Sequence, residues 1–107
     1  MIERFDEVNI ASRDYWFKVI EFLQQNWALI DTTSEGVVVW FMGDTGGVFD
    51  HIRLPSMNSA VVALERNGFK RYAKDQSAQK LIAVPAAPFR LSDHPNGPIY
   101  SSGRFWK

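Results

Sequence analysis

The chain of 107 residues contains no cysteine, and its two histidines, His51 and His94, stand 43 positions apart. Without thiols there is no disulfide framework, no cysteine nucleophile, and no zinc or iron–sulfur site held by cysteine. Two isolated histidines also disfavour a metal centre built from imidazoles. We therefore expect no cofactor and no metal ion.

Long apolar runs are missing as well. No stretch approaches the roughly 20 apolar residues that a membrane-spanning helix needs. The first residues alternate charged and apolar side chains, unlike the apolar centre of a secretory signal. We expect a cytoplasmic protein that does not enter a membrane, folded as a single domain over residues 1–107.

The formal net charge is zero, but the two halves of the chain differ in sign. Residues 1–50 carry nine acidic and three basic side chains, whereas residues 51–107 carry three acidic and nine basic ones. The halves could neutralise each other in the fold. Alternatively, they leave an acidic face for a basic partner and a basic face for an acidic one.

Aromatic residues make up 14% of the chain. Several of them lie in a segment that predicts a helix, which would begin after Ser12 as its N-cap and end at about Asn26. Apolar side chains recur there at the i, i+3, i+4, i+7 spacing of one helical face. They are Trp16, Val19, Ile20, Leu23 and Trp27.

Three strands are predicted next, over residues 28–32, 37–42 and 48–54, because these runs are rich in β-branched and aromatic residues. Short loops separate them, at residues 33–36 and 43–47. Consecutive strands with short loops indicate an antiparallel meander.

A second helix is predicted after Ser56, which suits an N-cap, with Met57, Ala60, Val61 and Leu64 as its buried stripe. Asn67-Gly68-Phe69 is typical of a Schellman stop with Gly68 in the left-handed conformation.

Weaker strands are predicted at residues 69–73 and 80–84, around a polar turn at 74–79. Residues 85–107 are expected to form an extended tail. The element order predicts an α+β domain. Its antiparallel sheet of three to five strands should carry both helices on one face.

The stretch Gly43-Asp44-Thr45-Gly46-Gly47 contains the Asp-Thr-Gly triplet of aspartic proteases. In those enzymes apolar residues lead directly into the aspartate and the chain is almost wholly β, which does not fit here. A phosphate-binding loop needs a lysine followed by serine or threonine, or a helix directly after the glycines, and neither is present. We interpret the stretch as a hairpin turn whose glycines supply positive φ.

Pairing Met42 with Val48 across this turn predicts which side chains share a face of the sheet. One face would hold Trp40 opposite Asp50 and Val38 opposite Ile52; the other would hold Phe41 opposite Phe49, Val39 opposite His51 and Val37 opposite Arg53. Both faces are largely apolar, and two helices can cover only one of them.

Three things could cover the second face. The C-terminal tail, with Ile99, Tyr100, Phe105 and Trp106, could fold over it. A second copy could form a homodimer there. A different protein could bind there, with His51 and Arg53 as polar contacts at the rim.

The sequence shows few residue arrangements that are typical of an active site. Asp50 and His51 are adjacent in a predicted strand, so their side chains should point to opposite faces. His94 lies in a turn with no residues spaced to complete a triad. The basic run from Lys70 to Lys74 interleaves an aromatic residue with charges, as nucleic-acid surfaces do.

We expect a protein that is not an enzyme and that does not bind nucleic acid directly. An enzyme or nucleic-acid-binding protein using His51 or Lys70–Lys74, or a homodimeric scaffold, remains the alternative.

Two segments carry a family resemblance: Leu64-Glu65-Arg66-Asn67-Gly68-Phe69-Lys70-Arg71-Tyr72 and Pro95-Asn96-Gly97-Pro98-Ile99-Tyr100-Ser101-Ser102-Gly103-Arg104-Phe105-Trp106. With the predicted leading helix and the Trp/Phe-rich hairpin, the chain resembles the small cytoplasmic immunity proteins of bacterial toxin–immunity systems, those of contact-dependent growth inhibition in particular.

The resemblance implies a non-enzymatic inhibitor. It would bind a cognate toxin domain, a nuclease being the expected kind, and block its active site or substrate surface. In that setting Asp31, Glu35, Asp44 or Asp50 could mimic nucleic-acid phosphates. The expected anchors are Phe41, Phe49, His51 and Arg53.

Overall fold

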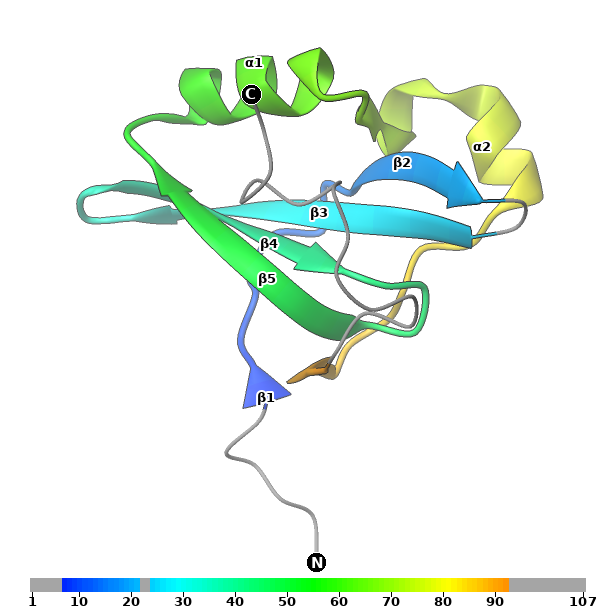
Figure 1. Cartoon of the computed structure of the whole chain (residues 1–107), viewed down its shortest axis with the longest axis horizontal. Helices are drawn as coiled ribbons and strands as arrows, with labels where there is room; N and C mark the ends of the chain where they lie inside the picture. The colour runs from blue at the N-terminus through cyan, green and yellow to red at the C-terminus, as the bar shows by residue number, and fades with distance from the viewer. Residues whose placement is uncertain (1–6, 22–23, 93–107) are drawn as a thin grey trace, which may run out of the picture.

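A computed structural model describes residues 7–21 and 24–92. They form one seven-stranded sheet with two α-helices and a short 3-10 helix (Figure 1). The strands are β1 (Glu7–Val8), β2 (Trp16–Glu21), β3 (Gln24–Thr33), β4 (Gly36–Met42), β5 (Gly47–Leu54), β6 (Lys70–Arg71) and β7 (Phe89–Leu91); the helices are α1 (Met57–Arg66), η1 (Tyr72–Lys74) and α2 (Gln76–Leu81).

The strand order is β1-β7-β5-β4-β3-β2-β6, and every neighbouring pair is antiparallel except β5 with β7. The predicted α+β class is confirmed. The sheet, however, is larger than the three to five strands expected, and it is mixed rather than purely antiparallel.

The predicted leading helix is wrong, because its residues form β2 and β3, which pair antiparallel. Trp16 and Phe17 are both buried, but they belong to clusters on opposite faces of the sheet. A strand covered on both sides does not need to alternate apolar and polar residues, so its pattern can imitate a helical stripe. The aromatic and β-branched content of the segment favoured the strand.

The predicted meander is confirmed as β3, β4 and β5, and so is the turn between the last two. Gly43 N–H donates to the Gly47 carbonyl over 3.0 Å, and Gly46 N–H donates to the Gly43 carbonyl over 3.1 Å. Gly46 has φ of +85°, a conformation that favours glycine.

The predicted register of the β4–β5 hairpin is wrong beyond its first pair. Met42 does lie opposite Val48, but Phe41 lies opposite Asp50, so Phe49 is an additional residue in β5. Such a β-bulge moves every later residue to the other face. The pairs are therefore Trp40 with His51, Val39 with Ile52, Val38 with Arg53, and Val37 with Leu54.

Helix α1 begins and ends as predicted. Ser56 and Ser59 form a reciprocal capping box, with each side-chain oxygen accepting from the other's backbone N–H. At the end, Phe69 N–H donates to the Leu64 carbonyl, and Gly68 has φ of +91°. Ala60 and Leu64 are fully buried as predicted, whereas Met57 is 43% exposed and does not belong to the buried stripe.

The later elements differ from the prediction. The strand expected at 69–73 is reduced to β6 followed by η1, and the residues expected as a turn and a strand at 74–84 contain α2 instead. Asp75 caps α2 by accepting from Ala78 N–H. The expected tail contributes β7 to the sheet, and residues 93–107, with His94 and the four aromatic and apolar residues named above, lie outside the described residues.

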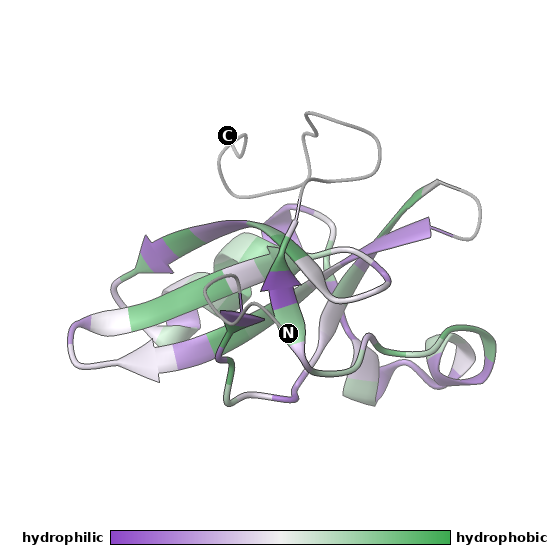
Figure 2. Ribbon diagram, turned by 90° about the horizontal axis from the view of Figure 1, so that it is seen from below, coloured by the Kyte–Doolittle hydropathy of each residue, from purple (hydrophilic) through white to green (hydrophobic). Residues whose placement is uncertain are grey.

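Each face of the sheet has its own hydrophobic core, and the two helices serve different faces rather than one. The α1 core contains Ala60 and Leu64, and the opposite core contains Ala78 of α2. Figure 2 shows apolar residues along the central strands that separate these cores.

Much of the face opposite α1 is covered by the chain itself, in part by a residue of the expected tail. Opposite α1, segments before β2 and after β6 pack on the sheet through buried Ile10, Tyr15 and Phe89. Each such side chain contributes roughly 1.5–3 kcal/mol by leaving water.

Candidate binding surface on strands β4 and β5

The face opposite α1 is covered unevenly, as three rows of paired residues across β3, β4 and β5 show. The rows are Trp27, Met42 and Val48; Leu29, Trp40 and His51; and Asp31, Val38 and Arg53. The first row is buried throughout. In the second row the exposure rises from β3 to β5, and in the third row the β5 residue is exposed although its β4 neighbour is buried. His51 and Arg53 are exposed and Trp40 is half-buried, and we call these three residues the β4–β5 patch.

Within the patch, the rings of Trp40 and His51 lie 5.1 Å apart between centroids, tilted by 38°. The indole Nε1 of Trp40 is buried and has no hydrogen-bond partner within residues 7–21 and 24–92. Neither His51 nor Arg53 forms an ion pair with another described residue. A buried N–H without an acceptor is unusual in folded proteins and calls for a specific explanation.

A small pocket adjoins the patch at Arg53. Arg53 lines it together with Thr33, Glu35, Leu54 and Pro55, and its volume is about 170 Å³. Strand β7 accompanies β5 only as far as Val48, so no described strand pairs with His51–Leu54 on that side. Within the described residues, Arg53 therefore borders a small pocket, and the β5 edge beside it is not paired with another strand.

Two of the predicted acidic site residues, Asp31 and Asp44, accept hydrogen bonds that stabilise the fold. Asp31 accepts hydrogen bonds from the N–H groups of Ala11, at 2.9 Å, and Ser12, at 2.8 Å. Asp44 accepts from Trp27 Nε1 at 2.8 Å and from Gln25 N–H at 3.2 Å. Both carboxylates tie distant segments together, a role that their place in the sequence did not reveal.

The other predicted acidic residues differ in exposure. Asp50 is 8% exposed, and its Oδ1 accepts from the backbone N–H of His51. The side chains of Asp50 and His51 point to opposite faces, as predicted. Glu35 is exposed in the turn between β3 and β4.

The predicted anchors do not share one surface. Phe41 is fully buried in the α1 core, with its ring 5.9 Å from that of Phe69. Phe49 is half-buried and packs against the same core. The structure thus brings His51 and Arg53 together, separates them from both phenylalanines, and adds Trp40, which the predicted register had placed on the other face.

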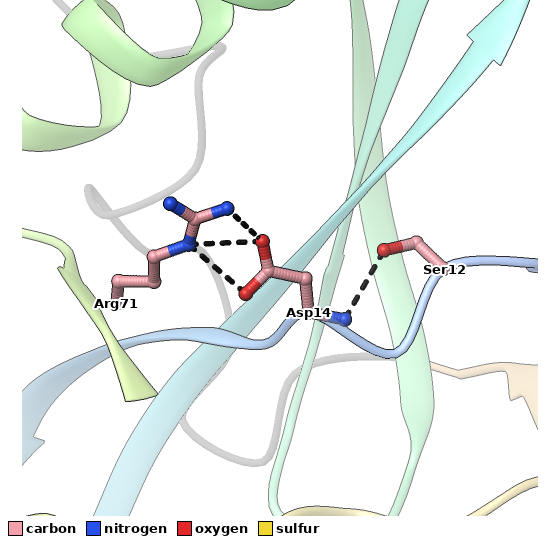
Figure 3. A network of polar contacts seen from close by, with 3 residues as sticks. All are labelled: Ser12, Asp14 and Arg71. Atoms are coloured by element: carbon pink, nitrogen blue, oxygen red, sulfur yellow. Dashed lines mark hydrogen bonds and ion pairs between the residues drawn. The ribbon is translucent and has the colours of Figure 1, made fainter. Parts of the chain in front are cut away.

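The basic run from Lys70 to Lys74 is only partly available at the surface. Arg71 makes a bidentate ion pair with Asp14 (Figure 3). Its guanidinium also lies 5.6 Å from the Trp16 ring centroid. The hydrogen bond and the charge of Asp14 raise the pKa of Arg71 above its ordinary value. Tyr72 packs against Trp27 inside the core, which leaves Lys70 and Lys74 as the exposed cations of the run.

A second pocket, of about 320 Å³, lies between residues 7–11 and residues 87–89. Its charged lining includes Arg13, which donates to the Ser12 carbonyl and lies 5.0 Å from the Phe89 ring centroid, and Asp31, already bonded to backbone N–H groups. These charged groups therefore support the local fold.

Among the described residues, no three His, Cys, Asp or Glu side chains gather as metal ligands would. No helix in that part of the chain is both long and apolar enough to cross a bilayer. Comparison of the chain with protein-family models, curated proteins and solved structures gave no match.

Proposed function

We propose that this chain is a non-enzymatic, protein-binding inhibitor of the immunity type. It binds a cognate bacterial toxin domain, of the nuclease kind that the resemblance implies, and blocks the active site or the substrate surface of that toxin. The β4–β5 patch is the contact surface. Arg53 and His51 reach toward the partner, and Trp40 lies between them and the core.

One observation carries this proposal: the buried indole N–H of Trp40 has no acceptor, and it lies beside two exposed polar side chains that have no ion-pair partner among the described residues. Aromatic and arginine side chains are the residues that most often dominate protein–protein binding energy. The pocket that Arg53 lines, of about 170 Å³, is smaller than ordinary small-molecule sites, which favours a macromolecular partner.

The first test is the neighbouring gene, which the proposal expects to encode a toxin domain; the chain is then paired with that domain. We expect the two proteins to co-purify, and expression of the chain to restore growth of cells that make the toxin. Arg53→Glu should abolish rescue, because it reverses the charge at the centre of the contact. Lys74→Glu is the matched control, since Lys74 is an exposed cation outside the patch.

Circular dichroism and thermal unfolding would establish that both variants fold. Absence of co-purification and rescue with the wild-type chain would refute the proposal. Tight RNA binding by the free protein, lost in Lys70→Ala and Lys74→Ala, would instead favour a nucleic-acid-binding protein. A stable dimer broken by Arg53→Glu would favour the homodimeric scaffold.

A further inference from the structure

We infer that the partner presents carboxylate groups to the β4–β5 patch, so that the contact surface on the partner is acidic. This inference rests on the proposed function and specifies the chemistry of the partner. The family resemblance had implied a different polarity, with acidic residues of this chain mimicking nucleic-acid phosphates.

The patch is rich in hydrogen-bond donors. Arg53 carries five N–H donors and no acceptor, the indole of Trp40 has one donor, and a neutral or charged imidazole at His51 has at least one. Carboxylates are acceptors that can satisfy an arginine fork with two parallel hydrogen bonds. The chemistry of the patch therefore fits an anionic group that only accepts.

Among the described residues, the acidic groups nearest Arg53 do not supply this acceptor. Asp31, in the same row as Arg53, accepts from two backbone N–H groups. Glu35 lines the same pocket as Arg53 but forms no ion pair with it. Asp50 points to the opposite face of the sheet.

Trp27 provides an internal precedent for the missing acceptor. Its indole N–H lies on the same face as that of Trp40, on the neighbouring strand, and it donates to the carboxylate of Asp44. The same donor type at Trp40 is buried without an acceptor. Because the Trp40 N–H is buried in the free chain, a partner's carboxylate would complete there what Asp44 supplies at Trp27 once the indole turns outward on binding.

Two other occupants fit the patch less well. Residues 93–107 carry Asp93 against Arg104 and Lys107, so their charge does not complement that of Arg53. A second copy docked symmetrically on this patch would bring the Arg53 side chains of both copies together, and like charges oppose association. An acidic surface of a different protein is the occupant whose charge complements the patch.

The experiment uses the full chain and two probe peptides, one alternating threonine with glutamate and one alternating threonine with glutamine. Binding is followed by the NMR signal of the Trp40 indole N–H, which the Trp40→Phe variant assigns. We expect the glutamate peptide to shift this signal and to bind about tenfold more tightly than the glutamine peptide.

Arg53→Gln should remove most of that difference, whereas Lys74→Gln, the matched loss of an exposed cation, should retain it. The inference is overturned if the two peptides bind alike, if neither binds, or if Lys74→Gln is as harmful as Arg53→Gln. Stronger binding of oligothymidylate than of the glutamate peptide would overturn it in favour of nucleic-acid phosphates.

Growth rescue separates this inference from the proposed function. If the wild-type chain rescues toxin-producing cells, and Arg53→Gln and Trp40→Phe rescue equally well, the acidic contact is refuted while the inhibitor function stands. If the wild-type chain does not rescue, the inhibitor function fails whatever the peptides show.

Discussion

The indole Nε1 of Trp27 donates a hydrogen bond of 2.8 Å to Oδ1 of Asp44, which joins the buried strand β3 to the turn between β4 and β5. The other carboxylate oxygen of Asp44 accepts from Gln25 N–H. An aspartate that looks like part of a protease triplet in the sequence is thus a structural support in the fold.

Replacing Asp44 with alanine should lower the free energy of unfolding by about 1–3 kcal/mol, because the buried Trp27 N–H loses its acceptor. Urea unfolding followed by tryptophan fluorescence measures the loss. Glu35→Ala is the control, since Glu35 is an exposed acid in the other hairpin turn. Equal stability of the Asp44→Ala variant and the wild-type chain would contradict this role.

Asp31→Ala should loosen the segment before β2, because the N–H groups of Ala11 and Ser12 both donate to Asp31. We expect faster hydrogen exchange at these two amides and a destabilisation of about 1–3 kcal/mol. Thr32→Ala, at the exposed neighbouring position, should leave exchange unchanged. Unaltered protection at Ala11 and Ser12 in Asp31→Ala would show that other contacts hold the segment.

Tyr15 should make the fold sensitive to alkaline pH. Its hydroxyl donates to the Pro85 carbonyl over 2.6 Å, and burial raises the pKa of Tyr15 above its ordinary value of 10.0. The folded state therefore favours the neutral phenol. The stability that this provides is complete below pH 10.0 and is lost as the pH rises through the higher folded pKa.

The free energy of unfolding should accordingly fall more steeply above about pH 10 in the wild-type chain than in Tyr15→Phe. Urea unfolding of both proteins across that pH range measures the difference. At neutral pH the two should differ by a constant amount, from the lost hydrogen bond. Parallel curves throughout the alkaline range would refute the assignment.

Gly36→Ala should destabilise the turn between β3 and β4. Gly36 has φ of +145°, and a Cβ atom there would lie 2.4 Å from the carbonyl oxygen of Leu54. The strain and the clash should cost about 1–3 kcal/mol, measured as a lower urea midpoint. Ser34→Ala, in the same turn, should have little effect, and a stable Gly36→Ala variant would mean that the turn can rearrange.

Local sequence signals predict the structure correctly where it depends on residues that are close together in the chain. The cap at Ser56 and the stop at Gly68 involve hydrogen bonds within a few positions, so their residue types predict them. The segment 12–26 was mistaken for a helix because its pattern depends on which distant segments cover each face of the sheet. Covering segments cannot be counted from periodicity.

The candidate surface was predictable only in part. His51 and Arg53 are two positions apart in a strand, so their common face follows from alternation alone. The bulge at Phe49 determines which residues of β4 lie opposite His51 and Arg53. No glycine or other turn residue at Phe49 indicates this bulge in the sequence. Trp40 was therefore assigned to the wrong face, and its unsatisfied N–H is a property of three-dimensional packing.

Strand β7 pairs with both β1 and β5, so residues 7 and 8 reach their place in the sheet only beside residues 89 and 90. During synthesis on the ribosome, that end of the sheet cannot close until the codons for residues 89–91 have been translated and the segment has emerged. The central hairpins can pair earlier, because their partners are close in the chain. For that interval the nascent protein displays apolar β-sheet surface, a stage at which chaperone binding would matter most.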